Sequence, residues 1–213
     1  MNNIKNNLEK YNSSTIVLMI ALVSFMGWCS ENIFIGITKG FMNNRNMYFP
    51  FLLGYGLIII VLYAVIGTPD TLIFSGKIKD RRKKYFLYFL LMFVIVSVCE
   101  IILGTTVEKL CGFVYWNYNN IPLHFTKFTS VPTSTGFALF ITFFMGKCFT
   151  PIMDHLAMIP EKISTPLAIA LGVIMLLDFG FSFFKMYIKH EKNQIWKIML
   201  MIIPRKGGRG QTP

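Results

Sequence analysis

The stretch that decides the fold is residues 85–110, YFLYFLLMFVIVSVCEIILGTTVEKL. It carries no charged residue before Glu100, and a helix needs about 20 mostly apolar residues to cross a bilayer. Similar apolar runs lie on both sides of it, at residues 15–37, 51–67, 131–149 and 163–187. The pattern predicts an all-α fold, an integral membrane helical bundle with five transmembrane helices.

Composition points to the same class. Of the 213 residues, 54% are hydrophobic and only 15% are charged, whereas a soluble domain is about one-quarter charged. The net charge is +11, but Lys and Arg flank the apolar runs, where they meet lipid headgroups. We therefore expect membrane lipids as partners and no nucleic acid. The common phosphate-loop, zinc-protease and hydrolase motifs are missing, so we expect no enzymatic activity, no cofactor and no metal site.

The apolar runs divide the chain into a polar N-terminal segment (1–14), a five-span transmembrane domain (15–187) and a basic tail (188–213) that is partly interfacial or disordered. This organisation predicts a multi-pass protein of the cell membrane. The Lys and Arg residues of the loops divide equally between the two sides, so they assign no orientation. Residues 195–203 are too short to span and are expected on the membrane surface.

Local signals set the expected helix ends. Ser13 or Ser14 is placed to cap the first helix. Pro151 is expected to end the fourth helix, and Pro166 to fall in the first turn of the fifth, where proline is tolerated. Two glycines around Tyr55, in Gly54-Tyr55-Gly56, are expected to permit close helix packing.

Acidic residues inside the predicted spans are the informative ones, because an ionisable group in hydrocarbon needs a partner, a proton or a watery cavity. They are Glu31, Glu100, Glu108 and Asp178. Helical spacing puts Glu100 and Glu108 on one broad face, with Gly104 between them, where a neighbouring helix could approach. One interpretation is a polar pathway or binding cavity. The other is that each acid only specifies helix packing.

Several motifs also follow one another in a recognisable order. They are Gly27-Trp28-x-x-Glu31, Lys39-Gly-Phe-Met-Asn43, Pro50-x-x-x-Gly54-Tyr-Gly56, Glu100, Val107-Glu-Lys-Leu110, Trp116-Asn-Tyr118, Pro151 and Leu177-Asp178-x-x-x-Ser182. This order, over residues 20–184, resembles the CmpB-like bacterial family of ABC-transporter permeases.

The resemblance implies a small five-span bacterial membrane protein and favours a transport component that works with a separate ATPase subunit or moves a small solute itself. A chain with five spans is expected to form a homo-oligomer in order to enclose a pathway. The resemblance also raises Trp116 and Tyr118 from interfacial anchors to candidate binding residues. Two departures stand out: Asn117 replaces the Asp of the family pattern, and residues 126–131 lack the Arg and Cys of the family's Asn-Gly-Arg-Ile-Cys-Leu stretch. The resemblance therefore does not extend to a role for that Arg.

Span polarity leads to one geometric prediction. In a five-span chain, the far ends of the first and third spans face the same side. Glu31 should therefore converge with Trp116 and Tyr118 at one mouth, with Glu108 beside them and aromatic rings available to a cation or an amphipathic ligand. The alternative function is a non-transporting membrane partner or regulator. An intramembrane enzyme acting on lipids ranks last, because the chain has neither an aspartate-rich pair nor a histidine-based centre.

Overall fold

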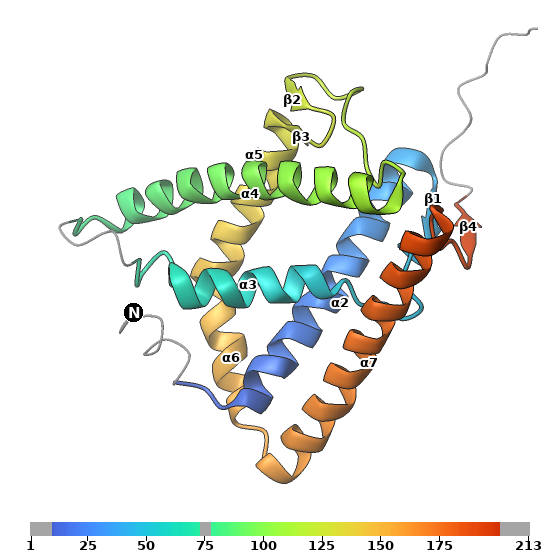
Figure 1. The fold of residues 1–213 in the computed structure, drawn as a ribbon. Helices are drawn as coiled ribbons and strands as arrows, with labels where there is room; N and C mark the ends of the chain where they lie inside the picture. The colour runs from blue at the N-terminus through green and yellow to red at the C-terminus, as the bar shows by residue number, and fades with distance from the viewer. Residues whose placement is uncertain (1–9, 73–77, 201–213) are drawn as a thin grey trace, which may run out of the picture.

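The computed structural model describes residues 10–72 and 78–200, and most of them are helical (Figure 1). Within this part of the chain, four helices are long and apolar enough to cross a membrane. They are α2 (Ser13–Lys39), α4 (Arg81–Cys111), the continuous helix Val131–Ala157 and α7 (Glu161–Lys189). The second predicted span, 51–67, is instead the short helix α3 (Leu53–Val65) of 13 residues.

The fourth predicted span continues past the proline that was expected to end it. It consists of α5 (Val131–Phe143), a π-helical turn η2 (Phe144–Cys148) and α6 (Phe149–Ala157). Pro151 has no N–H, so a carbonyl in the preceding turn loses its donor. Pro151 lies in α6, directly after η2, and the Tyr85 hydroxyl of α4 donates to the Gly146 carbonyl oxygen of that π-helical turn at 2.9 Å. The expectation for Pro151 was wrong, because the helix continues through it to Ala157 and a distant side chain satisfies a carbonyl of the adjoining turn.

Two other helix ends differ from the expected ones. The cap of α2 is Asn12, whose side chain accepts a 2.8 Å bond from the Thr15 N–H, rather than Ser13 or Ser14. Helix α7 begins at Glu161, so Pro166 lies in its second turn and not its first. Each helix therefore extends beyond its apolar run into polar residues that hydropathy alone does not assign to it.

Two small sheets flank the helices. The hairpin of β2 (His124–Thr126) and β3 (Thr129–Ser130) leads directly into α5. Strand β4 (Lys197–Met199) pairs antiparallel with β1 (Phe41–Asn43). The stretch 195–203, expected on the membrane surface, is thus partly a strand, and its residues 201–203 lie outside the described residues.

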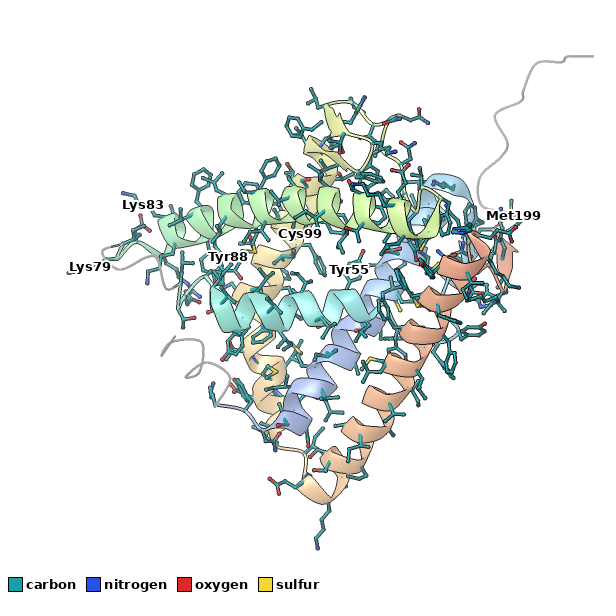
Figure 2. The ribbon with its side chains drawn as sticks, viewed as in Figure 1. Tyr55, Lys79, Lys83, Tyr88, Cys99 and Met199 are labelled. Atoms are coloured by element: carbon teal, nitrogen blue, oxygen red, sulfur yellow. The ribbon has the colours of Figure 1, made fainter. Side chains whose placement is uncertain are left out.

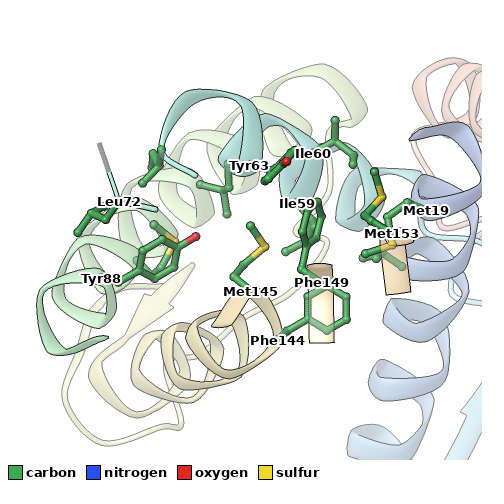
Figure 3. Close-up of a cluster of buried hydrophobic side chains, with 14 of the residues drawn as sticks. Met19, Ile59, Ile60, Tyr63, Leu72, Tyr88, Phe144, Met145, Phe149 and Met153 are labelled. Atoms are coloured by element: carbon green, nitrogen blue, oxygen red, sulfur yellow. The ribbon is translucent and has the colours of Figure 1, made fainter. Parts of the chain in front are cut away.

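The segment Val131–Ala157, interrupted by the π-helical turn, is here called the broken helix. The core forms where α2, α3, α4 and the broken helix meet. Met19, Ile59, Tyr63, Met145 and Phe149 belong to its main cluster (Figure 3). The predicted close approach of α2 and α3 is confirmed at Gly56, where an added Cβ would lie 2.3 Å from the Ile20 carbonyl oxygen. Gly54 has no such neighbour, since a Cβ added there would have nothing within 4 Å.

Candidate functional site

Loops 40–52, 112–130 and 190–200 meet at one end of the bundle, here called the loop end. The Tyr115 hydroxyl donates to the Arg45 carbonyl oxygen at 3.1 Å, and the Lys192 ammonium donates to the Tyr115 carbonyl oxygen at 3.2 Å. The opposite end joins the start of α2 to the broken helix, since the Tyr11 hydroxyl donates to Asp154 at 2.7 Å. The predicted acids Glu31 and Glu108 lie near the loop end of their helices.

Glu31 forms an ion pair with Arg45. The Arg45 Nε donates to Glu31 Oε2 at 2.6 Å, and the Tyr55 hydroxyl of α3 donates to Oε1 at 2.7 Å. The two charged side chains are only 25% and 16% exposed. Since a partly buried carboxylate needs compensation, the position of Glu31 depends on a loop residue and on a neighbouring helix.

Sequence reasoning missed Arg45. It lies in the polar turn Asn43-Asn44-Arg45-Asn46 and has a φ of 51°, in the left-handed region that non-glycine residues rarely adopt. Its backbone N–H donates to the Asn43 side chain at 3.0 Å, which holds the turn. The available signal was a lone basic residue in the loop directly after the helix that carries Glu31.

Glu100 has a different environment, made of hydroxyl groups. The Thr129 Oγ1 donates to Glu100 Oε2 at 2.8 Å and the Ser134 Oγ donates to the same oxygen at 3.2 Å. Both hydroxyl residues are fully buried. No Lys, Arg or His of the described residues forms an ion pair with Glu100, so polar neighbours rather than a cation accommodate it.

Tyr118, in the 112–130 loop, lies near both acids. Burial raises the pKa of its phenol most, and the nearby charges of Glu100 and Glu31 raise it further. Tyr55 lies between α3 and α4 in Figure 2 and donates to Glu31. We call Glu31, Arg45, Tyr55, Tyr118 and Glu100 the acid–tyrosine cluster. The charge of Glu31 acts on Tyr118, so both residues lie at the loop end, and their convergence in one site with Trp116 stays a prediction.

Burial also affects the neighbouring Tyr115. It raises the pKa of the Tyr115 phenol to about 12, and the charge of Glu31 contributes in the same direction. A phenol that stays protonated acts as a hydrogen-bond donor, as Tyr115 does toward Arg45. The loop end is therefore fixed by neutral tyrosines around one ion pair.

One segment of loop runs along the acidic face of α4. Lys127 Nζ donates to Glu108 at 2.6 Å, the Phe128 ring lies on Gly104, and Thr129 reaches Glu100. An added Cβ on Gly104 would lie 2.4 Å from the Phe128 ring. The expected neighbour of Gly104, another helix, was wrong. A position without a side chain admits a flat ring as readily as a helix, and helical spacing does not distinguish the two.

Trp116 and Asp178 have other surroundings. The Trp116 Nε1 donates to the Phe128 carbonyl oxygen at 2.9 Å, which packs this indole on the hairpin segment. Asp178 is 5% exposed and accepts bonds from the backbone N–H groups of Tyr48 and Phe49 at 2.7 and 2.9 Å. Its contacts fasten the Arg45 loop to α7.

The chemistry available to the acid–tyrosine cluster is that of carboxylates, hydroxyls and one guanidinium. Among residues 10–72 and 78–200, no three His, Cys, Asp or Glu side chains gather as a metal site would require. The cluster can bind protons, cations or polar groups. Whether its residues act as a site stays a prediction.

Comparison with known proteins places the chain in a family. No curated protein and no solved structure matches it. The sequence model of the family described as "Putative ABC-transporter type IV", the CmpB family, matches residues 18–183. That range covers most of the chain and contains the whole acid–tyrosine cluster. The chain therefore belongs to this CmpB family, as the order of its motifs predicted.

Proposed function

We propose that this chain is a multi-pass protein of the cell membrane and the membrane-embedded component of an ABC-type transporter. The acid–tyrosine cluster would be its polar binding or translocation site. The observation that carries the proposal is that two acids of the long apolar helices have polar partners inside the protein: Glu31 of α2 binds Arg45 and Tyr55, and Glu100 of α4 binds Thr129 and Ser134. Membership of the family supports the transporter class.

The proposal includes five crossings, with α3 as the short one. The 13 residues of α3 extend about 20 Å at 1.5 Å per residue, less than the hydrocarbon thickness of about 30 Å. Local thinning of the bilayer can accommodate such a helix. Support comes from the ends of the helices, because α2 and α4 both finish at the loop end, where Tyr115 contacts Arg45. If two spanning helices both end on the same side, the chain must cross the membrane once between them. In this proposal α3 makes that crossing.

A transport role also needs partners. The chain has no phosphate-binding loop, so hydrolysis of ATP would come from a separate ATPase subunit. Five helices are few to surround a pathway through the membrane. We therefore include a second copy of the chain or another membrane protein in the proposal. The lipids of the membrane contact the remaining apolar faces.

The alternative is a non-transporting membrane partner or regulator whose acids only fix packing. Asp178 favours it, because both carboxylate oxygens of that buried acid bind backbone N–H groups. Glu108 and its pairing with Lys127 also fit a structural role. Glu100, with no cationic partner among the described residues, is the acid that such a role explains least.

The test is purification of the tagged chain from native membranes in mild detergent. We expect a nucleotide-binding subunit in fixed proportion to the chain, and ATP hydrolysis by the reconstituted pair. Glu100→Gln should alter that hydrolysis while leaving assembly intact, and Glu108→Gln serves as the matched control. A stable complex without any ATPase subunit would reject the transporter proposal and favour the regulator.

A further inference from the structure

Three oxygen atoms around Glu100 contact one another directly. Thr129 Oγ1 lies 2.8 Å from Glu100 Oε2, Ser134 Oγ lies 3.2 Å from the same atom, and the two hydroxyl oxygens lie 2.9 Å apart. All three separations are within hydrogen-bond range. We call these three groups the hydroxyl ring.

Counting hydrogens decides the state of the carboxyl group. Each hydroxyl supplies one hydrogen to donate. If Glu100 is ionised, the hydroxyls of Thr129 and Ser134 supply two hydrogens for three oxygen–oxygen contacts, so whichever way they point, one contact has no hydrogen. Both residues are 0% exposed, and a buried polar contact without a hydrogen is costly.

A proton on Glu100 supplies the missing hydrogen. The carboxyl group then donates to Ser134, Ser134 donates to Thr129, and Thr129 donates back to Glu100. Each group gives one hydrogen bond and receives one, and such closed chains reinforce their members. We infer that Glu100 is a proton-binding site, occupied by an exchangeable proton in this conformation. That this proton couples to transport rests on the function proposed above.

The groups around Glu100 support a proton rather than a metal ion. Thr129 from β3 and Ser134 from α5 are uncharged, and Tyr118 from the 112–130 loop is close enough for its phenol to be affected by the charge of the acid. Glu31, whose charge also acts on Tyr118, is already paired with Arg45. A hard metal ion requires six or more oxygens spread around it, whereas the oxygens of the hydroxyl ring touch one another.

The other intramembrane acid of α4, Glu108, has a cationic partner. Glu108 lies two turns from Glu100 on α4 and is paired with Lys127 at 2.6 Å. Its carboxylate therefore has a cation of its own. Glu108 is the natural comparison, because the two acids share one helix and one loop segment but differ in their partners.

Infrared spectroscopy of the protein in lipid nanodiscs reads the proton directly. At neutral pH, the spectrum of the wild type minus that of Glu100→Gln should contain the C=O stretching band of a protonated carboxyl group, shifted in D₂O. The wild type minus Glu108→Gln should lack it. Thr129→Val should move the band, because the carboxyl group loses a ring partner. Absence of the band from the Glu100 difference spectrum overturns the inference.

A second measurement uses the unmodified chain, so it does not depend on the folding of a variant. The O–H of a protonated carboxyl group adds across the C=N bond of an apolar carbodiimide. The adduct then rearranges to a stable N-acylurea, and neither step releases a leaving group. Mass spectrometry should find the adduct at Glu100, decreasing as pH rises. An adduct at Glu108 instead contradicts the inference. Both readouts are independent of any ATPase, so a proton on Glu100 stands or falls separately from the transporter proposal.

Discussion

The ion pair of Arg45 and Glu31 shows how one loop residue neutralises an acid in a membrane-spanning helix. Removing one member of a buried ion pair leaves the other uncompensated, at a cost of about 3–5 kcal/mol when burial is complete. Arg45 is 16% exposed and Glu31 is 25% exposed, so the expected cost is smaller. We expect Arg45→Met to lower the free energy of unfolding by about 2 kcal/mol.

Thermal unfolding in detergent measures this change. Glu31→Gln combined with Arg45→Met should restore most of the loss, because the double variant leaves no unpaired charge. If Arg45→Met unfolds at the temperature of the wild type, the pair does not hold the loop.

The raised pKa of Tyr115 predicts a response to alkali. The phenol has a pKa of about 12 in the fold against its usual 10.0, so folding favours its protonated form. That contribution is complete below pH 10.0 and is lost as the pH rises toward 12. Tyr115→Phe, which cannot ionise, should show a weaker fall in melting temperature over this interval. A parallel fall in both proteins would assign the alkaline sensitivity to other groups.

At the scale of elements, Gly104 controls how the hairpin segment lies on α4. We expect Gly104→Ala to destabilise the protein by about 1–3 kcal/mol, since the added Cβ would lie 2.4 Å from the Phe128 ring. Gly136→Ala is the matched control, because nothing lies within 4 Å of that position on α5. It should be neutral or stabilising, as alanine favours helix. Equal melting temperatures for the two variants would show that Phe128 moves aside freely.

The broken helix yields a second prediction at this scale. Tyr85→Phe removes the hydroxyl that donates to the Gly146 carbonyl oxygen at 2.9 Å, at an expected cost of about 1 kcal/mol. Hydrogen exchange should become faster around residues 144–151. Tyr187→Phe is the control, since that side chain is 49% exposed on α7. Unchanged exchange near Pro151 would mean that η2 does not depend on Tyr85.

The elements also show which parts of the structure a sequence reveals. Hydropathy located the long helices, because crossing hydrocarbon imposes a length and a composition. It did not reveal that the helix continues through Pro151, since the adjoining π-helical turn is bonded by Tyr85, which is 61 residues away from the Gly146 carbonyl oxygen that accepts its hydrogen. It found Glu31 and Glu100 as costly acids, but not Arg45, Thr129 or Ser134. These partners of the two acids lie in loops, a short strand and the start of a helix, where no periodicity of the sequence indicates which way a side chain points.

For the whole molecule, the arrangement of the loops predicts a topology. Reporter fusions after residues 45, 80, 120, 159 and 195 should alternate between the two sides of the membrane. Residues 45 and 80 flank α3, so they form the critical pair, because the 13-residue helix is shorter than a usual span. If both report the same side, α3 does not cross, and the chain has four crossings.

The pairing of β1 with β4 has a consequence for biogenesis. It joins residues 41–43 to residues 197–199, so the first strand has no partner until about 150 more residues have been synthesised. Asn44 likewise receives its bond from Ile195 at 3.1 Å and donates to Asn193 at 2.8 Å. A nascent chain can insert its apolar helices one by one. The turn that presents Arg45 to Glu31, however, forms its hydrogen bonds to residues 193–195 only after those residues have left the ribosome. Assembly of the cluster therefore has to wait until residues 193–199 have been synthesised.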